Sequence, residues 1–202
     1  VAIMAGQYAA WHGQEGIREI AQDINNTAAT IAEGAKAYGY KQLNETYFDT
    51  IRLECPVDAE KVCQEARNNQ MNFLLIDNKT IGISTDETTG CKQVRAILNV
   101  LAHSAGKTFG EVCCQKANSI PASLQRKSAF LTQRVFNAYH SETEMMRYLK
   151  KLEVKDLSLN RAMIPLGSCT MKLNAAMEMI PFTWAEFANI HPFVPREQAE
   201  GY

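Results

Sequence analysis

A turn of small polar residues after a glycine is the part of the chain best suited to hold an anion. Within residues 163–174, Pro165 and Gly167 interrupt regular structure, and Ser168 and Thr170 follow directly. Either hydroxyl can cap a helix, and the residues that come next are good helix formers. The first N–H groups of a helix have no partner within it and favour a phosphate or carboxylate. The stretch therefore predicts an anion-receiving turn.

Two side chains of this turn could take part in catalysis. Cys169 could be a nucleophile whose thiolate is favoured by a helix N-terminus and by Lys172. A cysteine nucleophile needs a base within hydrogen-bond reach, and the sequence does not place His140 or His191 beside it. Lys172 could form an imine, but such a lysine is usually desolvated or close to other cations. A helix cap without any ligand is the alternative for the whole turn.

The histidines have both structural and functional interpretations. His140 precedes Ser141 and Glu144, which have the spacing of a capping box. It either shapes the start of that helix or points into a shared active site. His191 stands before Pro192, where the backbone is extended and could aim the imidazole inward.

Composition excludes several classes of function. The chain has 202 residues, 46% of them hydrophobic, and a formal net charge of −1. It has no run of five like charges, which argues against a nucleic-acid footprint or a basic membrane patch. The six cysteines are scattered and lack metal-ligand spacing, so reduced thiols are expected and a zinc site is not.

The first part of the chain is expected to be helical. Apolar or small residues recur with helical periodicity over residues 1–38, and two glycines in residues 11–16 interrupt them. The pattern predicts a short helix, a break, and a longer helix over residues 14–37.

A small α+β domain is expected next. Alternation and β-branched residues indicate strands, Asx residues indicate a tight turn, and an Asp start indicates a helix. Three strands covered by two helices would form two layers. The expected elements are a strand at 46–55, a helix at 58–69, strands at 72–77 and 81–84, and a helix at 90–103 capped by residues 85–89.

The residues after this domain lose clear periodicity and then become helical again. The sequence of residues 104–136 predicts a long, mostly extended connector with one short helical turn at 110–117. A helix is expected from Ser141 to about Val154.

Several motifs resemble the glycine cleavage system P-protein family. The sequence IPLGSCTMKLN at residues 164–174 closely resembles its signature. The sequence YHSETEMMRY precedes it, and EMIPFTW and HPF follow it, in the order of that family. The resemblance is strongest over residues 126–202 and continues, more loosely, before them.

This resemblance implies an α+β fold of the fold-type I, aminotransferase-like class, in an enzyme that uses pyridoxal phosphate. It implies a fragment that ends the first of two such halves and begins the second. The expected division is 1–38 for inter-domain helices, 39–104 for the small α+β domain of the first half, 105–138 for the connector, and 139–202 for the start of the second half.

The resemblance also implies an activity for the complete enzyme. That enzyme would release the carboxyl carbon of glycine as CO2 and pass the aminomethyl group to the lipoyl arm of the H-protein, acting as a dimer. The lysine that holds the cofactor is expected downstream of this chain, so the fragment would contain no catalytic residue and be inactive alone. Its compartment would be the cytoplasm in a bacterium or the mitochondrial matrix in a eukaryote.

The residues expected to contact glycine or the cofactor phosphate are those of the central turn and two histidines. Two rivals stay open: a structural or docking module without ligand contact, and an independent thiol enzyme built on Cys169. The candidates are Gly167, Ser168, Cys169, Thr170, Lys172, His140 and His191.

Overall fold

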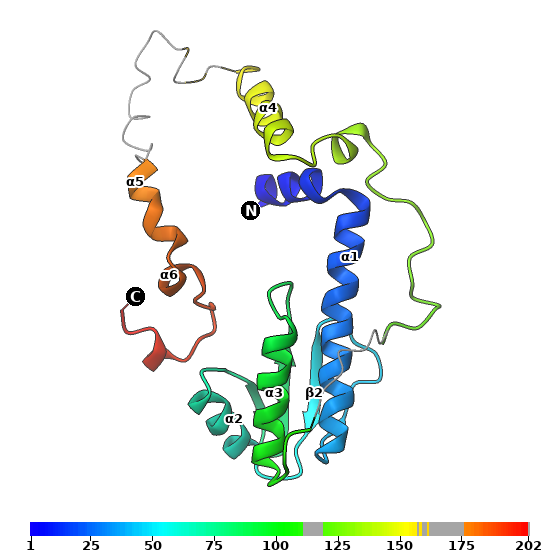
Figure 1. Cartoon of the computed structure of the whole chain (residues 1–202), viewed down its shortest axis with the longest axis vertical. Coiled ribbons are helices and arrows are strands. Elements are labelled where there is room, and N and C mark those ends of the chain that lie inside the picture. Colours follow the sequence, from blue (N-terminus) through cyan, green and yellow to red (C-terminus); the bar gives the residue numbers. More distant parts are fainter. Residues whose placement is uncertain (111–118, 157, 159–160, 162–175, 202) are drawn as a thin grey trace. The chain divides into compact units, whose positions relative to one another are not determined.

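The structure, a computed structural model, describes residues 1–110, 119–156, 158, 161 and 176–201. It divides into two compact units, Val1–Met145 and Met146–Tyr202. Figure 1 traces the elements along the chain.

The first unit begins with a long helix that is broken once. Helix α1 spans Ala2–Ala37, and Gly13 has non-helical backbone angles of φ 64° and ψ −171°. Glycine adopts such angles readily because it has no Cβ, so the glycine-containing sequence breaks the helix here. The expected short helix, break and longer helix are confirmed.

A small antiparallel sheet follows α1. All neighbouring strands pair antiparallel in the order β1-β2-β4-β3. Ile51 and Leu53 of β2 are fully buried while Thr50 and Arg52 are exposed, so the strand alternates between the core and the other face. The strands are β1 (Lys41–Gln42), β2 (Thr50–Glu54), β3 (Leu74–Asp77) and β4 (Thr80–Ser84).

The sheet has one strand more than the sequence predicted. The expected three strands are β2, β3 and β4, within a few residues of their predicted bounds. The additional strand, β1, has two residues and exists through its pairing with β2, Lys41 opposite Glu54 and Gln42 opposite Leu53. A strand this short has no alternation to detect.

Three helices, rather than the expected two, form the second layer. Helices α2 (Ala59–Asn68) and α3 (Cys91–Ser104) lie where the sequence predicted them, and the second arm of α1 joins them. Helix α3 contacts both α1 and α2, and Figure 1 shows it between them. Gly34 of α1 permits the close approach, because a Cβ there would lie 2.8 Å from Leu98 Cδ1. The α+β class and its two layers are confirmed.

Hydrogen bonds between neighbouring residues determine where α2 and α3 begin. The Asp58 side chain accepts a hydrogen bond of 3.0 Å from the Glu60 N–H and caps α2. Helix α3 begins at Gly90, whose N–H donates to Gln93 Oε1 at 3.2 Å. Residues 85–89 were expected to cap α3, but Asp86 instead closes a turn by accepting from the Thr88 N–H at 2.9 Å.

The described part of the connector is attached to the first unit at two places. Ser119 bonds to Asn25 and to the Tyr47 carbonyl, and the 3-10 helix η1 (Arg134–Asn137) packs against α1. Most of its other side chains are exposed. The expected helical turn at 110–117 lies almost wholly outside the described residues.

Helix α4 and short helices make up the rest of the described chain. Ser141 Oγ accepts from the Glu144 N–H at 3.3 Å and donates to Glu144 Oε2 at 3.0 Å, so the predicted N-cap is confirmed. None of the described helices is long and apolar enough to cross a membrane. The elements are α4 (Glu142–Glu153), α5 (Ala176–Met179), η3 (Ile180–Thr183), α6 (Ala185–Ala188) and η4 (Arg196–Gln198).

Candidate functional site

The central turn lies outside the residues that the structure describes. This holds for Gly167, Ser168, Cys169, Thr170 and Lys172. Their anion-binding and catalytic roles stay predictions.

His140 lies at the kink of α1. Its Nδ1 is 2.6 Å from the backbone oxygen of Trp11, at the end of the first arm of the helix. A carbonyl oxygen only accepts, so Nδ1 must carry the proton. The bond satisfies one of the carbonyls that a helix leaves without a partner at its C-terminus. His140 therefore joins the residues just after the connector to the break in α1.

Gly13 makes room for this contact. A Cβ at Gly13 would lie 2.6 Å from the Phe136 carbonyl oxygen and 2.9 Å from His140 Cε1. The positive φ at Gly13 and the close approach of the connector therefore both require glycine. The active-site role of His140 stays a prediction, beside this observed structural one.

His191 closes a local turn. Its Nδ1 accepts a hydrogen bond of 3.0 Å from the Phe193 N–H, and the two rings are 5.8 Å apart between centroids. Since Nδ1 accepts here, the proton of the neutral ring is on Nε2. The Nδ1 hydrogen bond of His191 lies within the second unit, and that of His140 lies within the first.

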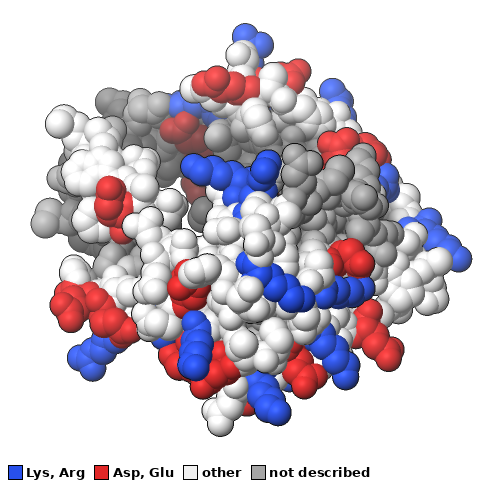
Figure 2. Space-filling view, turned by 60° about the horizontal axis from the view of Figure 1, so that its bottom comes forward, with Lys and Arg blue, Asp and Glu red and all other residues white. Residues whose placement is uncertain are grey.

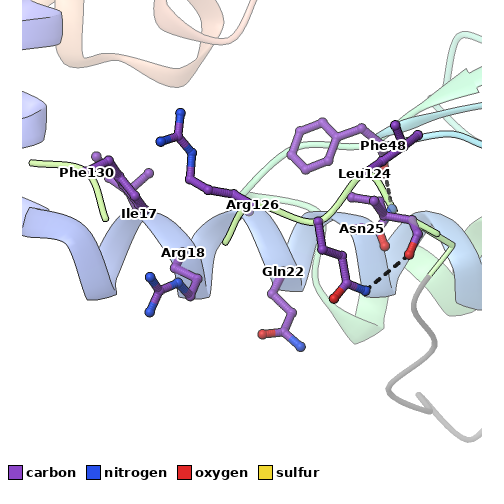
Figure 3. A pocket seen from close by; sticks show the side chains of 11 residues that line it. Ile17, Arg18, Gln22, Asn25, Phe48, Leu124, Arg126 and Phe130 are labelled. Atoms are coloured by element: carbon purple, nitrogen blue, oxygen red, sulfur yellow. Dashed lines mark hydrogen bonds between the residues drawn. The ribbon is translucent and has the colours of Figure 1, made fainter. Parts of the chain in front are cut away.

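A cavity of about 380 Å³ lies between the second arm of α1 and the connector. Figure 3 shows Arg126 extending from the connector toward Phe130, above Arg18 on α1. The guanidinium carbons of Arg18 and Arg126 are 5.7 and 5.1 Å from the centre of the Phe130 ring. Both distances are within the range of cation–π attraction. The cavity is lined by Ile17, Arg18, Ala21, Gln22, Asn25, Phe48, Ile120, Leu124, Gln125, Arg126 and Phe130.

Asn25 holds the floor of this cavity in place. Its side chain is 3% exposed. Nδ2 donates to the Phe48 carbonyl and to Ser119 Oγ, both at 2.7 Å, and Oδ1 accepts from the Ser119 N–H at 3.2 Å. Asn25 is thus a structural residue that ties α1 to the connector and to the loop before β2.

The cavity offers binding groups rather than acid–base chemistry. Its described lining contains two arginines, amides and apolar side chains, and no carboxylate, histidine or cysteine. General acid–base catalysis needs a group that exchanges a proton near the working pH, and arginine does not. Sequence reasoning missed this cavity because its two walls are about a hundred residues apart in the chain.

Two buried thiols, Cys55 and Cys63, and the described lysines are poorly suited to covalent chemistry. Burial raises the pKa of the Cys55 thiol to about 12, and it also raises the pKa of Cys63. Both therefore stay protonated at neutral pH. Every described lysine is exposed, whereas a lysine that forms an imine is usually desolvated.

On one face of the molecule, charged side chains of the two signs are mixed. Figure 2 shows Lys and Arg interspersed with Asp and Glu. Among the residues whose placement is described, no group of three or more His, Cys, Asp or Glu could hold a metal ion.

The family model and the similar proteins that match this chain all belong to one family. The family model described as "Glycine cleavage system P-protein" matches residues 1–101. "Glycine dehydrogenase (decarboxylating)" of Paraburkholderia xenovorans is 46% identical over the whole chain, and that of Flavobacterium johnsoniae 48%. The human mitochondrial enzyme of the same name is 45% identical, again over the whole chain.

These relatives are much longer than the chain. The chain spans 22% of the Paraburkholderia relative, 21% of the Flavobacterium relative and 20% of the human one. The family match covers α1, the complete sheet, α2 and most of α3, and the relatives extend the similarity over all the remaining residues. The chain belongs to the glycine cleavage system P-protein family.

Proposed function

We propose that this chain is a segment of a glycine-decarboxylating enzyme of the glycine cleavage system. The observation that supports this most directly is similarity at 45–48% identity over the whole chain to enzymes named glycine dehydrogenase (decarboxylating). The complete enzyme would convert glycine to CO2 and pass the aminomethyl group to the lipoyl arm of an H-protein. It would work in the bacterial cytoplasm or the mitochondrial matrix, as a dimer.

The cofactor of the complete enzyme would be pyridoxal phosphate, held in a fold-type I framework. The lysines that the structure describes do not fit its covalent attachment, since all of them are exposed. We therefore assign the attachment to a lysine elsewhere in the enzyme, and no catalytic residue to the described part of this segment.

The segment would supply a folded support and part of a pocket wall. The small domain would end the first half of the enzyme, and the connector would lead from it to the second half. The two bonds of Ser119 to Asn25 attach the connector to α1, and the His140 bond to the Trp11 carbonyl attaches the chain just after the connector. The central turn, from Gly167 to Lys172, would contact the glycine carboxylate or the cofactor phosphate.

Substitution of the central turn in the full-length enzyme tests this function. We expect Ser168→Ala and Lys172→Met each to raise the KM for glycine or weaken cofactor binding by about tenfold or more, because each removes a charged or polar contact to an anion. The readouts are glycine-dependent exchange of labelled CO2 and the absorbance of bound cofactor. Lys92→Met, an exposed lysine at the start of α3, is the matched control.

Unchanged kinetic constants and cofactor content in both variants would favour the rival function, a structural or docking module without ligand contact. Borohydride reduction followed by peptide mass spectrometry then locates the cofactor lysine. A full-occupancy adduct at Lys172 would contradict the proposed placement. The thiol-enzyme alternative requires turnover by this chain alone that Cys169→Ser abolishes.

A further inference from the structure

We propose that the cavity between α1 and the connector binds a small organic anion with a flat apolar body, such as an aromatic carboxylate. The proposal does not rest on the proposed function, and none of the residues that line the cavity belongs to the central turn. The argument rests on the cavity's size, its charge and the fixed position of its walls.

The size and lining of the cavity match those of small-molecule sites. Its volume of about 380 Å³ falls in the range of roughly 300–1,000 Å³ typical of ligand pockets. Phe48, Leu124 and Ile17 supply apolar surface, and the first two are exposed by 43% and 68%. A flat apolar ligand would cover this surface and remove it from water.

The charge of the lining selects an anion. Arg18 is already paired, since its Nη1 lies 2.8 Å from Glu15 Oε1. Arg126 donates to Ser128 Oγ at 3.1 Å and forms no ion pair with any residue that the structure describes. Its remaining guanidinium N–H groups match a carboxylate, which can accept two parallel hydrogen bonds from arginine.

The walls are held in place before any ligand binds. Phe130 is contacted by the guanidinium groups of both Arg18 and Arg126, so its ring and the Arg126 side chain support each other. On the other side, Asn25 fixes the Phe48 carbonyl and Ser119. A site whose walls are already ordered loses less entropy when it binds.

The test uses the full-length enzyme with benzoate as the probe and benzamide as its neutral counterpart. Ligand-observed NMR titration gives the affinity of each. We expect saturable benzoate binding that excess glycine does not displace, and weaker binding of benzamide. Arg126→Met should weaken benzoate binding by about tenfold or more without changing benzamide binding, since it removes a charge-assisted bond.

Arg52→Met, which removes an exposed arginine from β2, is the matched control and should leave benzoate binding unchanged. Arg126→Lys should restore part of the affinity, since the charge returns without the paired donors. Equal affinity for benzoate and benzamide would overturn the proposal, as would displacement by glycine. So would the absence of any benzoate binding to the full-length enzyme, which would mean that another part of that polypeptide fills the cavity.

Discussion

The two units of the chain differ in how they bury apolar side chains. In Val1–Met145, a continuous core joins α1, the sheet, α2 and α3, with Ile31, Ile51, Leu53 and Leu98 fully buried. In the described part of Met146–Tyr202, several large aromatic residues stay exposed, Phe182 by 64%, Trp184 by 52% and Phe193 by 91%. The first unit thus has a core of its own, whereas the described part of the second exposes these aromatic side chains.

The difference shows where each unit obtains its stability. Burial of apolar surface is the dominant favourable term in folding, and the first unit achieves it within one small domain. Clusters of exposed aromatic residues normally mark a surface that contacts other protein. We therefore expect the first unit to be stable by itself and the second to gain its stability within the full-length enzyme.

The largest effect should come from the core of the first unit. Leu98→Ala removes a fully buried side chain at the contact of α3 with α1, and we expect it to lower the free energy of unfolding by about 2–5 kcal/mol. Urea unfolding followed by circular dichroism measures the change. A loss below about 1 kcal/mol would contradict a closed core in this unit.

Gly34 provides a control for the same contact. Gly34→Ala alone should be destabilising, because its Cβ would lie 2.8 Å from Leu98 Cδ1. Combined with Leu98→Ala, the added methyl group enters the space that the leucine vacated. The double variant should therefore lose less stability than the two single losses added together, and strict additivity would show that the two residues are not in contact.

Asn25 should have the next largest effect. Asn25→Ala removes the side-chain partner of the Phe48 carbonyl and of the Ser119 N–H, and we expect a loss of about 2–3 kcal/mol. Asn26→Ala, on the same helix but without a side-chain hydrogen bond to the described residues, is the matched control. Equal losses for both variants would mean that the connector is not held by Asn25.

A substitution at the kink in α1 should cause a smaller loss of stability, confined to the contact between the kink and η1. Gly13→Ala forces a side chain into a positive-φ conformation and against the Phe136 carbonyl, so we expect a cost of about 1–3 kcal/mol. Hydrogen exchange should show faster exchange of the η1 amides than in the wild-type chain. Gly6→Ala lies in the first arm with open space around it and should be neutral or stabilising by up to about 1 kcal/mol.

The sequence predicts the local structure of the first unit well, since the signals are local. Asp58 marks the start of α2, the alternation around Ile51 and Leu53 marks a strand, and the glycines of residues 11–16 mark the break in α1. Each signal acts within a few residues of the element that it defines.

The contacts that position the connector could not be predicted, because they join distant parts of the chain. His140 bonds to the Trp11 carbonyl across 129 residues, and Ser119 bonds to Asn25 across 94. Strand β1 is defined by its partner, and the cavity by two walls that only the fold brings together. Periodicity and capping patterns carry no information on such pairings. The role of the central turn is predicted from its residue types and from the family resemblance. Substitution of Ser168 and Lys172 tests that prediction.

The smallest effect in the chain itself should come from the second unit. Phe193→Ser replaces a side chain that is 91% exposed, and we expect the free energy of unfolding to change by no more than about 0.5 kcal/mol. In the full-length enzyme, the same substitution should cost several times more if other parts of the polypeptide cover this ring. Thermal unfolding of both proteins, each with and without the substitution, measures the difference. An equally small effect in the full-length enzyme would show that this aromatic surface stays open there, and the second unit would then have to be stabilised by contacts other than its aromatic side chains.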